Sequence, residues 1–147
     1  MKPGSAPRAR SIVTQLPKIT RRRSPISGWG VYAAQSIPED AYIVEYKGAL
    51  VSQPEAWRRE QRYLPRQRIW IFTIDDKVAR DAAFGGNIAR YVNHSCRPNC
   101  YVDIEGRHIW IKASRDIRKG EELTYDYNTE GVAGIPCRCR PGCKKVI

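Results

Sequence analysis

The apolar residues of this chain fall in short runs that glycine and proline interrupt, and this pattern limits the folds open to it. Tyr42–Tyr46 and Arg68–Ile74 are rich in β-branched and aromatic residues, as short strands are. Tyr101–Ile104 and His108–Lys112 flank the turn residues Glu105-Gly106-Arg107 and predict a hairpin. Because strands do not alternate regularly with helices, the pattern argues against a doubly wound nucleotide fold. We therefore expect a mostly β domain.

The other patterned segments are equally short. Gln53–Arg62 predicts a polar helix that Pro65 prevents from continuing. Asn87–Val92 predicts one or two helical turns, and Leu123–Tyr127 predicts a strand. No internal repeat is evident. The chain has 147 residues, the usual size of one domain.

Positive charge is concentrated at the N-terminus. The chain carries a formal net charge of +11, and residues 1–23 hold seven Lys and Arg and no acid. We interpret residues 1–23 as a flexible basic arm, with the folded body beginning near Ser24. Such arms often bind nucleic acid, although a solvated leader has the same composition. No apolar run has the ~20 residues that cross a bilayer, and no secretion signal is present. We therefore expect no membrane contact and a soluble intracellular protein.

The cysteines favour a metal site over disulfides. Their number, five, is odd, and three of them fall within residues 137–143. In an intracellular protein such crowding is more typical of metal binding than of disulfide bonds. The five are Cys96, Cys100, Cys137, Cys139 and Cys143.

Three further segments carry polar residues that could do chemistry, and each is weak alone. Asn93-His94-Ser95-Cys96 suggests a Cys/His nucleophile, but sequence neighbours rarely form such a dyad and no third group is evident. A buried polar turn is the simpler alternative. Gly28-Trp29-Gly30 permits a tight turn or a close ligand. Glu122–Tyr127 resembles an ordinary aromatic strand.

Together these segments resemble the SET family of protein-lysine methyltransferases. The similarity covers Ser24 to the C-terminus. The matching segments, in the family's order, are Gly28-Trp29-Gly30, Glu45-Tyr46-Lys47-Gly48, Gly86 to Cys96, and Gly120 to Tyr127. The resemblance implies a mostly β SET-domain fold, with several small curved sheets, short helices and a knot-like C-terminal crossing. It also implies a catalytic domain over residues 24–130 and a post-SET-like zinc-binding tail over residues 131–147.

The resemblance implies roles for particular residues. The cofactor S-adenosylmethionine would contact Gly28, Trp29, Gly30, Arg90, Asn93, His94 and Tyr127. The channel for the target lysine would be walled by Tyr46, Tyr125 and Tyr127, with Tyr127 as the catalytic tyrosine. Methyl transfer needs a neutral amine, whereas free lysine titrates near ~10.4. An aromatic channel and a neighbouring sulfonium charge both disfavour the ammonium form, so no strong base is required.

The resemblance also implies a structural zinc ion. Its ligands would be Cys96, Cys137, Cys139 and Cys143, which leaves Cys100 over. One feature departs from the family: only Arg140-Pro141-Gly142 separates the last two cysteines, where the family usually has four residues. A reduced, metal-free tail is the alternative.

The expected function is transfer of a methyl group from S-adenosylmethionine to a lysine side-chain amine of a protein. A histone, another DNA-associated basic protein and a ribosomal protein are all open as the substrate. The alternative is a non-catalytic, zinc-stabilised module that binds nucleic acid through its basic arm. Chromatin, a nucleoid or, for a secreted effector, a host nucleus would each suit such a protein. The sequence specifies no oligomeric state.

Overall fold

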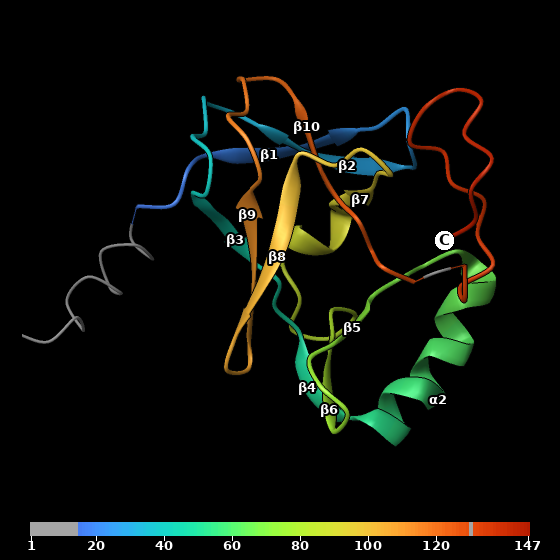
Figure 1. Ribbon diagram of the computed structural model, residues 1–147. Coiled ribbons are helices and arrows are strands. Elements are labelled where there is room, and N and C mark those ends of the chain that lie inside the picture. The colour runs from blue at the N-terminus through green and yellow to red at the C-terminus, as the bar shows by residue number, and fades with distance from the viewer. Residues whose placement is uncertain (1–14, 130) are drawn as a thin grey trace, which may run out of the picture.

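Three small sheets and one α-helix make up the part of the protein that the structure describes (Figure 1). The structure is a computed structural model, and it describes residues 15–129 and 131–147. The first sheet has the strand order β1-β2-β10-β7. Its strands are β1 (Ile19–Arg23), β2 (Trp29–Ala33), β10 (Glu122–Tyr125) and β7 (Asn93–His94). Within the described residues, no helix is long and apolar enough to cross a membrane.

The other two sheets have three strands each and are antiparallel. The second consists of β3 (Tyr42–Glu45), β9 (His108–Ala113) and β8 (Cys100–Glu105). The third consists of β4 (Ala49–Ser52), β6 (Val78–Asp81) and β5 (Ile71–Thr73). The helical segments are α2 (Gln53–Tyr63), η1 (Leu64–Arg66) and η2 (Ile88–Tyr91). The predicted hairpin, helix and helical turns are thus confirmed.

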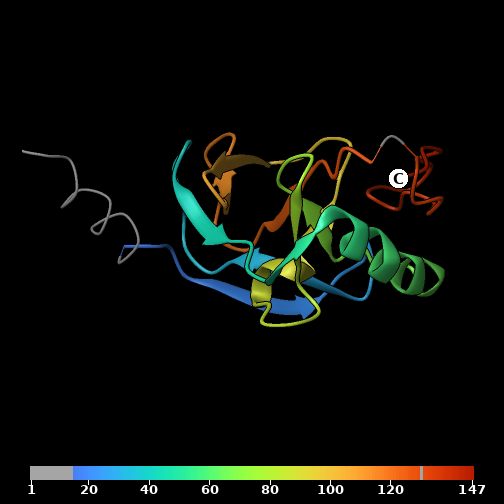
Figure 2. The same cartoon turned by 90° about the horizontal axis from the view of Figure 1, so that it is seen from below.

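Helix α2 is anchored to the third sheet by a buried carboxylate. Asp81 is fully buried on β6, and its Oδ2 accepts hydrogen bonds from Arg59 (2.9 Å) and Tyr63 (2.7 Å). A buried charge is tolerated only when it is paired and hydrogen-bonded, as here. Ser52 caps the helix by accepting from the Glu55 amide. The C-terminal tail lies at the same end of the molecule as α2 in both views (Figures 1 and 2).

Two loops cross at the centre of the fold with reciprocal bonds. Ile37 N donates to Ile117 O (2.9 Å), and Ile117 N donates to Ile37 O (2.8 Å). Both isoleucines are 1% exposed, so this bridge lies within the core. Three residues after each isoleucine the chain has a positive φ, +66° at Asp40 and +96° at Gly120. The two loops therefore share one conformation.

The similarity extends to the flanking strands. Asp40 N donates to Ala113 O, and Gly120 N donates to Ala33 O, both at 2.8 Å. Ala33 and Ala113 stand eighty positions apart, as do Ile37 and Ile117. The two loops thus share a backbone arrangement, although no internal repeat is evident in the sequence. Too few side chains are shared for the arrangement to be visible in sequence, because it rests on backbone bonds.

Two expectations need correction. The N-terminal part was predicted to be a flexible arm up to residue 23, but Ile19–Arg23 forms β1 and pairs along its whole length with β2. The arginines of β1 stay exposed, so the strand has no apolar face to reveal it. Residues 1–14 lie outside the described part. The strand predicted over Arg68–Ile74 covers only Ile71–Thr73, because Arg68 N bonds back to Tyr63 O at the end of α2.

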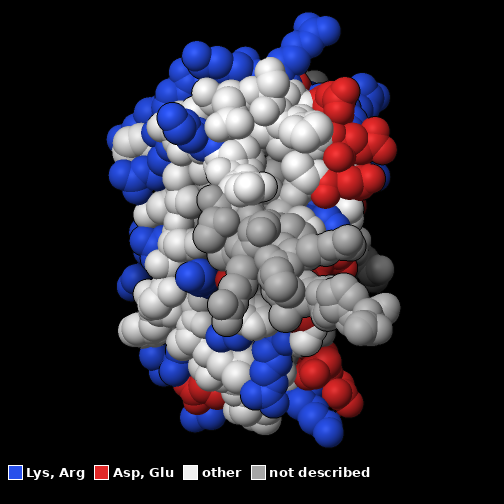
Figure 3. Space-filling view, turned by 90° about the vertical axis from the view of Figure 1, so that its left-hand side faces the viewer, with Lys and Arg blue, Asp and Glu red and all other residues white. Residues whose placement is uncertain are grey.

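Lys and Arg side chains gather along one edge of the face seen in Figure 3, and Asp and Glu side chains gather near the upper part of the opposite edge. Positive and negative side chains are therefore unevenly distributed over this face.

The parallel pairing of β7 with β10 brings the two principal motifs together. Thr124 lies opposite Asn93, and Tyr125 lies opposite His94. Asn99 extends the contact, since its side chain donates to Glu122 O and accepts from Thr124 N, both at 2.9 Å. The knot-like crossing expected at this point stays a prediction of the resemblance.

Candidate active site

A cavity of about 560 Å³ lies between the N-terminal turn, the loop before β5, η2 with β7, and the C-terminal tail. The predicted cofactor residues Gly28, Trp29, Arg90, Asn93, His94 and Tyr127 all line it. Gly30 does not line the cavity. It is buried directly behind the turn, on β2.

Asn93 holds the turn that forms one wall of this cavity. Its side-chain nitrogen lies 3.0 Å from Trp29 O and 3.3 Å from Ser27 O. The turn is also closed by a bond from Ser24 N to Gly28 O of 2.8 Å. The Asn93 amide is therefore occupied in positioning the backbone of the turn.

Glu122 supports the same turn from the neighbouring strand. Its carboxylate accepts hydrogen bonds from Ser24 Oγ (2.7 Å), from the Asn93 amide (2.9 Å) and from the Tyr32 hydroxyl (3.2 Å). Charge-assisted bonds of this kind are stronger than neutral ones. Glu122 thus connects β10, which leads to the aromatic motif, with the turn at the cavity. The sequence predicted no role for Glu122 or Ser24.

A second cavity, of about 490 Å³, is also lined by Tyr127. Its aromatic wall consists of the predicted channel residues Tyr46, Tyr125 and Tyr127, together with Phe72. Phe72 contacts both Tyr46 and Tyr125, with ring centroids 5.2 and 6.0 Å apart. Of the aromatic residues, only Tyr127 lines both cavities. Phe72 was missed as a wall residue, although its strand was predicted.

The hydroxyl groups of the three tyrosines differ in their partners. Tyr127 donates to Val92 O (2.6 Å) and Tyr46 donates to Trp70 O (2.9 Å). Tyr125 makes no hydroxyl hydrogen bond to the residues that the structure describes, although its ring is 5% exposed. Desolvation by burial raises the pKa of all three phenols above that of free tyrosine. The phenols are therefore neutral near pH 7.

His94 connects the aromatic motif with the cysteines. Its Nδ1 accepts from Tyr127 N (3.1 Å), so the ring proton lies on Nε2, which is 3.5 Å from Cys96 Sγ. Burial lowers the pKa of His94, which favours this neutral form. A hydrogen bond from a neutral histidine to a thiolate sulfur suits a residue just outside a metal site. Asp126 Oδ1 lies 3.8 Å from the same Nδ1, but that nitrogen already accepts from the Tyr127 amide and Cys96 belongs to the cysteine cluster, which argues against a Cys/His nucleophile.

Arg90 lies in the cavity wall, but its guanidinium group is largely occupied. It donates to Ala82 O (3.2 Å) and to the Tyr91 hydroxyl (2.9 Å), and it stacks on Trp70 at 5.0 Å. Trp70 also lines the cavity and was not predicted to do so. The only feature of the sequence that pointed to Trp70 was its position in the predicted strand Arg68–Ile74.

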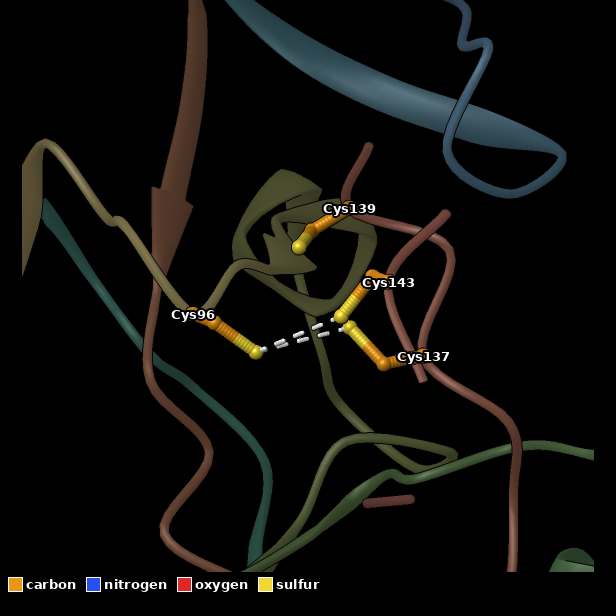
Figure 4. A group of neighbouring side chains, drawn as sticks. All are labelled: Cys96, Cys137, Cys139 and Cys143. Atoms are coloured by element: carbon orange, nitrogen blue, oxygen red, sulfur yellow. Dashed lines mark hydrogen bonds between the residues drawn. The ribbon is translucent and has the colours of Figure 1, made fainter. Parts of the chain in front are cut away.

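Four cysteines meet beside this cavity, and their side chains point toward one another (Figure 4). They are Cys96, Cys137, Cys139 and Cys143, the four that the resemblance implied, and their sulfur atoms all lie within 4.8 Å of one another. Cys96 Sγ lies 3.7 Å from Cys137 Sγ and 3.9 Å from Cys143 Sγ. Sulfurs at ~2.3 Å from a tetrahedral zinc are about 3.8 Å apart. The spacing therefore fits zinc and is far too long for disulfides.

The shortened spacing between the last two ligands does not prevent this arrangement. Cys143 N donates to Arg140 O (3.2 Å), which closes a tight turn. Gly142 takes a φ of +79° there, a conformation that other residues rarely adopt. The three intervening residues thus return the chain to the cluster. Cys100 lies outside it, buried against β9, with its pKa raised to about 12 by desolvation.

The ionisation of the cluster also suits a cation. Desolvation raises the pKa of Cys137 to about 12. Desolvation acts the same way on Cys139, but hydrogen bonds from the Cys96 backbone and the neighbouring thiols outweigh it and lower that pKa to about 6. One thiolate is thus favoured, and a bound cation would stabilise the others. The residues present fit a closed four-thiolate zinc site.

The site thus combines two features. One tyrosine, Tyr127, lines two cavities, and a four-cysteine cluster lies beside the first of them. The chain belongs to the SET domain family, whose family model matches residues 28–128.

Curated relatives agree with this assignment. A "Histone-lysine N-methyltransferase, H3 lysine-4 specific" of Chaetomium globosum is 47% identical over 127 residues, which cover 80% of this chain and 12% of the relative. "Histone-lysine N-methyltransferase set1" of Dictyostelium discoideum is 38% identical over 146 residues, which cover 93% of this chain and 10% of the relative. The chain therefore spans about a tenth of the length of these relatives.

Solved structures share the fold. A chain of the Chaetomium thermophilum Polycomb Repressive Complex 2 has a TM-score of 0.69 at 32% identity, covering 77% of this chain and 16% of that chain. Another structure of ctPRC2, described as autoinhibited and bound to S-adenosylmethionine, has a TM-score of 0.70 at 32% identity, with coverage of 77% and 15%. The expected SET-domain fold is thus confirmed.

Proposed function

We propose that this domain transfers a methyl group from S-adenosylmethionine to a lysine side-chain amine of a histone. Its family and the names of its relatives support this reaction. The single observation that carries it is the position of Tyr127, which lines both cavities. A donor in one cavity and an amine in the other would meet beside its ring.

The larger cavity suits the proposed donor. Its volume of about 560 Å³ falls within the ~300–1,000 Å³ typical of cofactor sites. Backbone groups of Gly28 and Trp29, with Arg90, Asn93, His94 and Tyr127, would hold the cofactor. When bound, the cofactor supplies an electrophilic methyl group on a sulfonium. The Asn93 contribution is positional, because its amide already binds the turn.

The second cavity suits a lysine amine. The wall formed by Tyr46, Phe72, Tyr125 and Tyr127 carries no charge near pH 7, which disfavours an ammonium beside it. Two acidic residues, Glu60 and Asp126, also line this cavity and would attract an incoming lysine. Neutralising a free lysine at pH 7.4 costs ~4 kcal/mol at ~1.36 kcal/mol per pKa unit. Burial raises the pKa of Tyr127, so this phenol does not serve as the base. Deprotonation therefore precedes transfer, favoured by the aromatic walls.

Tyr127 orients the amine through its lone pairs. Its hydroxyl proton is given to Val92 O at 2.6 Å. The oxygen is then left to accept a hydrogen bond from an amine N–H. An amine held in this way keeps its own lone pair free to point away from Tyr127. Such alignment is a major source of rate enhancement in a displacement reaction.

The cysteine tail has a structural part in this proposal. Cys96, Cys137, Cys139 and Cys143 would hold one zinc ion, which would bind the tail to the β7 segment. Residues 135–138 of the tail line the larger cavity, so loss of the metal would open that wall. The zinc has no chemical step here.

The substrate and setting follow from the relatives. Their names specify histones, and the ctPRC2 neighbour is part of a multiprotein complex. We infer a nuclear, chromatin-associated protein that works within a larger assembly. The basic N-terminal residues would contact nucleic acid in that setting.

Calorimetry with S-adenosylhomocysteine tests the proposal most directly. Zinc-loaded protein should bind this reaction product, and mass spectrometry should then find methyl-lysine on recombinant histones or nucleosomes incubated with S-adenosylmethionine. Folded, zinc-loaded protein that binds no S-adenosylhomocysteine would favour the non-catalytic alternative. If only non-histone proteins are methylated, the proposed reaction is supported and the proposal of a histone substrate is rejected.

A further inference from the structure

Arginines from three separate segments line the larger cavity or stack on a residue that lines it. Arg66 and Arg68 come from the loop before β5, and Arg138 comes from the C-terminal tail; all three line the cavity. Arg21 and Arg23 come from β1, and each guanidinium carbon lies 4.3 Å from the ring of Trp29, which also lines it. We call these five residues the arginine rim.

The charge of the rim is uncompensated. All five side chains belong to exposed residues. None forms an ion pair within residues 15–129 and 131–147. The residues that line the cavity include no aspartate and no glutamate. Elsewhere exposed arginines do find acids, as Arg115 does with Glu121 at 2.8 Å.

Several rim arginines are held in place by aromatic rings. Arg21 lies 4.3 Å from the Trp29 ring and 4.9 Å from the Tyr91 ring. Arg68 lies 4.8 Å from the Trp70 ring. A stacked guanidinium keeps its N–H groups free at the edge and loses less entropy when it binds an oxyanion.

The proposed cofactor does not account for this charge. S-adenosylmethionine has one carboxylate, which one or two arginines can bind, and two cationic groups, which the others repel. The arginines do not converge on one buried cradle but are spread around an opening. A chain of phosphates is the ligand that such a distribution suits, and arginine with interleaved aromatic residues is typical of nucleic-acid surfaces.

We propose that the arginine rim binds the phosphodiester backbone of nucleic acid and that the bound nucleic acid covers the mouth of the cofactor cavity. Nucleic acid and cofactor then oppose each other's binding by the same factor, as linkage requires. The rate of methyl transfer then depends on whether DNA is bound at the arginine rim. The binding part is independent of the proposed methyl transfer, and only the competition part depends on a cofactor in this cavity.

Fluorescence anisotropy with a short labelled DNA duplex tests the rim. The test variant is Arg21→Gln, Arg66→Gln and Arg138→Gln combined. The control is Arg107→Gln, Arg118→Gln and Lys119→Gln combined, which removes the same charge from exposed positions away from the cavity. We expect the rim variant to bind at least tenfold more weakly and the control to change much less. The slope of log affinity against log salt should fall by about 0.9 for each phosphate that the rim variant no longer neutralises.

The competition arm uses unlabelled S-adenosylhomocysteine. Saturating amounts should weaken duplex binding by wild-type protein, and the duplex should raise the calorimetric Kd of S-adenosylhomocysteine by the same factor. If the rim variant and the control variant lose duplex affinity equally, only net charge matters, and the proposal that the rim binds DNA is wrong. If saturating S-adenosylhomocysteine leaves the duplex affinity unchanged, bound DNA does not cover the cofactor cavity. If no S-adenosylhomocysteine binds at all, the proposed function fails, and the variant comparison alone decides the rim.

Discussion

The carboxylate of Glu122 occupies the space that a side chain at position 30 would need. A Cβ built on Gly30 would lie 2.9 Å from Cδ of Glu122 and 2.9 Å from Cβ of Ser24, and closer still to Oε2 of Glu122. Glycine at position 30 thus lets the carboxylate reach Ser24 and Asn93, which support the turn at the cofactor cavity. The first and last motifs of the domain meet at this pair.

Gly30→Ala should therefore disturb the turn through Glu122. Overpacking of this kind costs typically about 1–3 kcal/mol. We expect a lower free energy of unfolding in urea and a Kd for S-adenosylhomocysteine that rises at least tenfold. Gly106→Ala is a control for destabilisation alone: its φ of +65° strains an alanine there, but Gly106 lies outside the cofactor cavity, so the Kd for S-adenosylhomocysteine should not rise.

A double variant separates the clash from other effects. Glu122→Ala removes the carboxylate and leaves only the contact with Ser24 Cβ, so Gly30→Ala should cost less when it is added to that variant. Residues in contact show coupling energies of about 0.5–3 kcal/mol in such cycles. Costs that simply add would show that the Gly30–Glu122 contact is not what makes glycine necessary.

Tyr127→Phe should lower turnover by ten-fold or more. The variant loses the oxygen proposed to orient the amine and leaves Val92 O without its partner. The Kd for the cofactor should change less, since the ring remains. Steady-state kinetics with a histone substrate measures both. Tyr101→Phe is the matched control, because that hydroxyl donates to Asp40 and Tyr101 lines neither cavity. Near-normal turnover by Tyr127→Phe would remove this residue from its assigned role.

Tyr125 should limit how many methyl groups are added. Its hydroxyl has no partner among the described residues and lines the second cavity, so it is available to bind the amine, directly or through water. That bond occupies space that a methylated amine needs. We expect mainly monomethyl product, with Tyr125→Phe shifting mass-spectrometric products toward higher methylation. Tyr46→Phe should shift the products less, because the Tyr46 hydroxyl already donates to Trp70 O and has no proton free to donate to the amine. Rapid trimethylation by the unmodified enzyme would exclude this limit.

Freshly purified, reduced protein should contain about one zinc per chain. Cys139→Ser should release the metal and loosen the C-terminal tail, because thiolate binding contributes to the order of such sites. Elemental analysis and limited proteolysis follow the two effects. Cys100→Ser should retain the zinc, since Cys100 lies outside the cluster. If wild-type protein contains no metal, the alternative of a reduced, metal-free tail is favoured.

The sequence by itself determined the local elements and, through its motifs, the family. Short β-branched and aromatic runs predicted the β8–β9 hairpin, and polar residues ending at a proline predicted α2. The matching motifs selected all four clustered cysteines before any geometry was known. These signals are local in the chain, so periodicity, turn residues and spacing are enough to reveal them.

Only the tertiary structure decided the contacts between distant segments. The strand at Ile19–Arg23 forms because β2 offers it backbone partners, while its own exposed arginines give no periodic signal. Glu122 meets Ser24 across ninety-eight positions, and Tyr127 meets Val92 across thirty-five. Such contacts depend on which backbone groups the fold leaves free and on space left by absent side chains. Local residue preferences encode neither of these. The support of the turn by Glu122, the place of Tyr127 between two cavities and the arginine rim therefore became visible only in three dimensions.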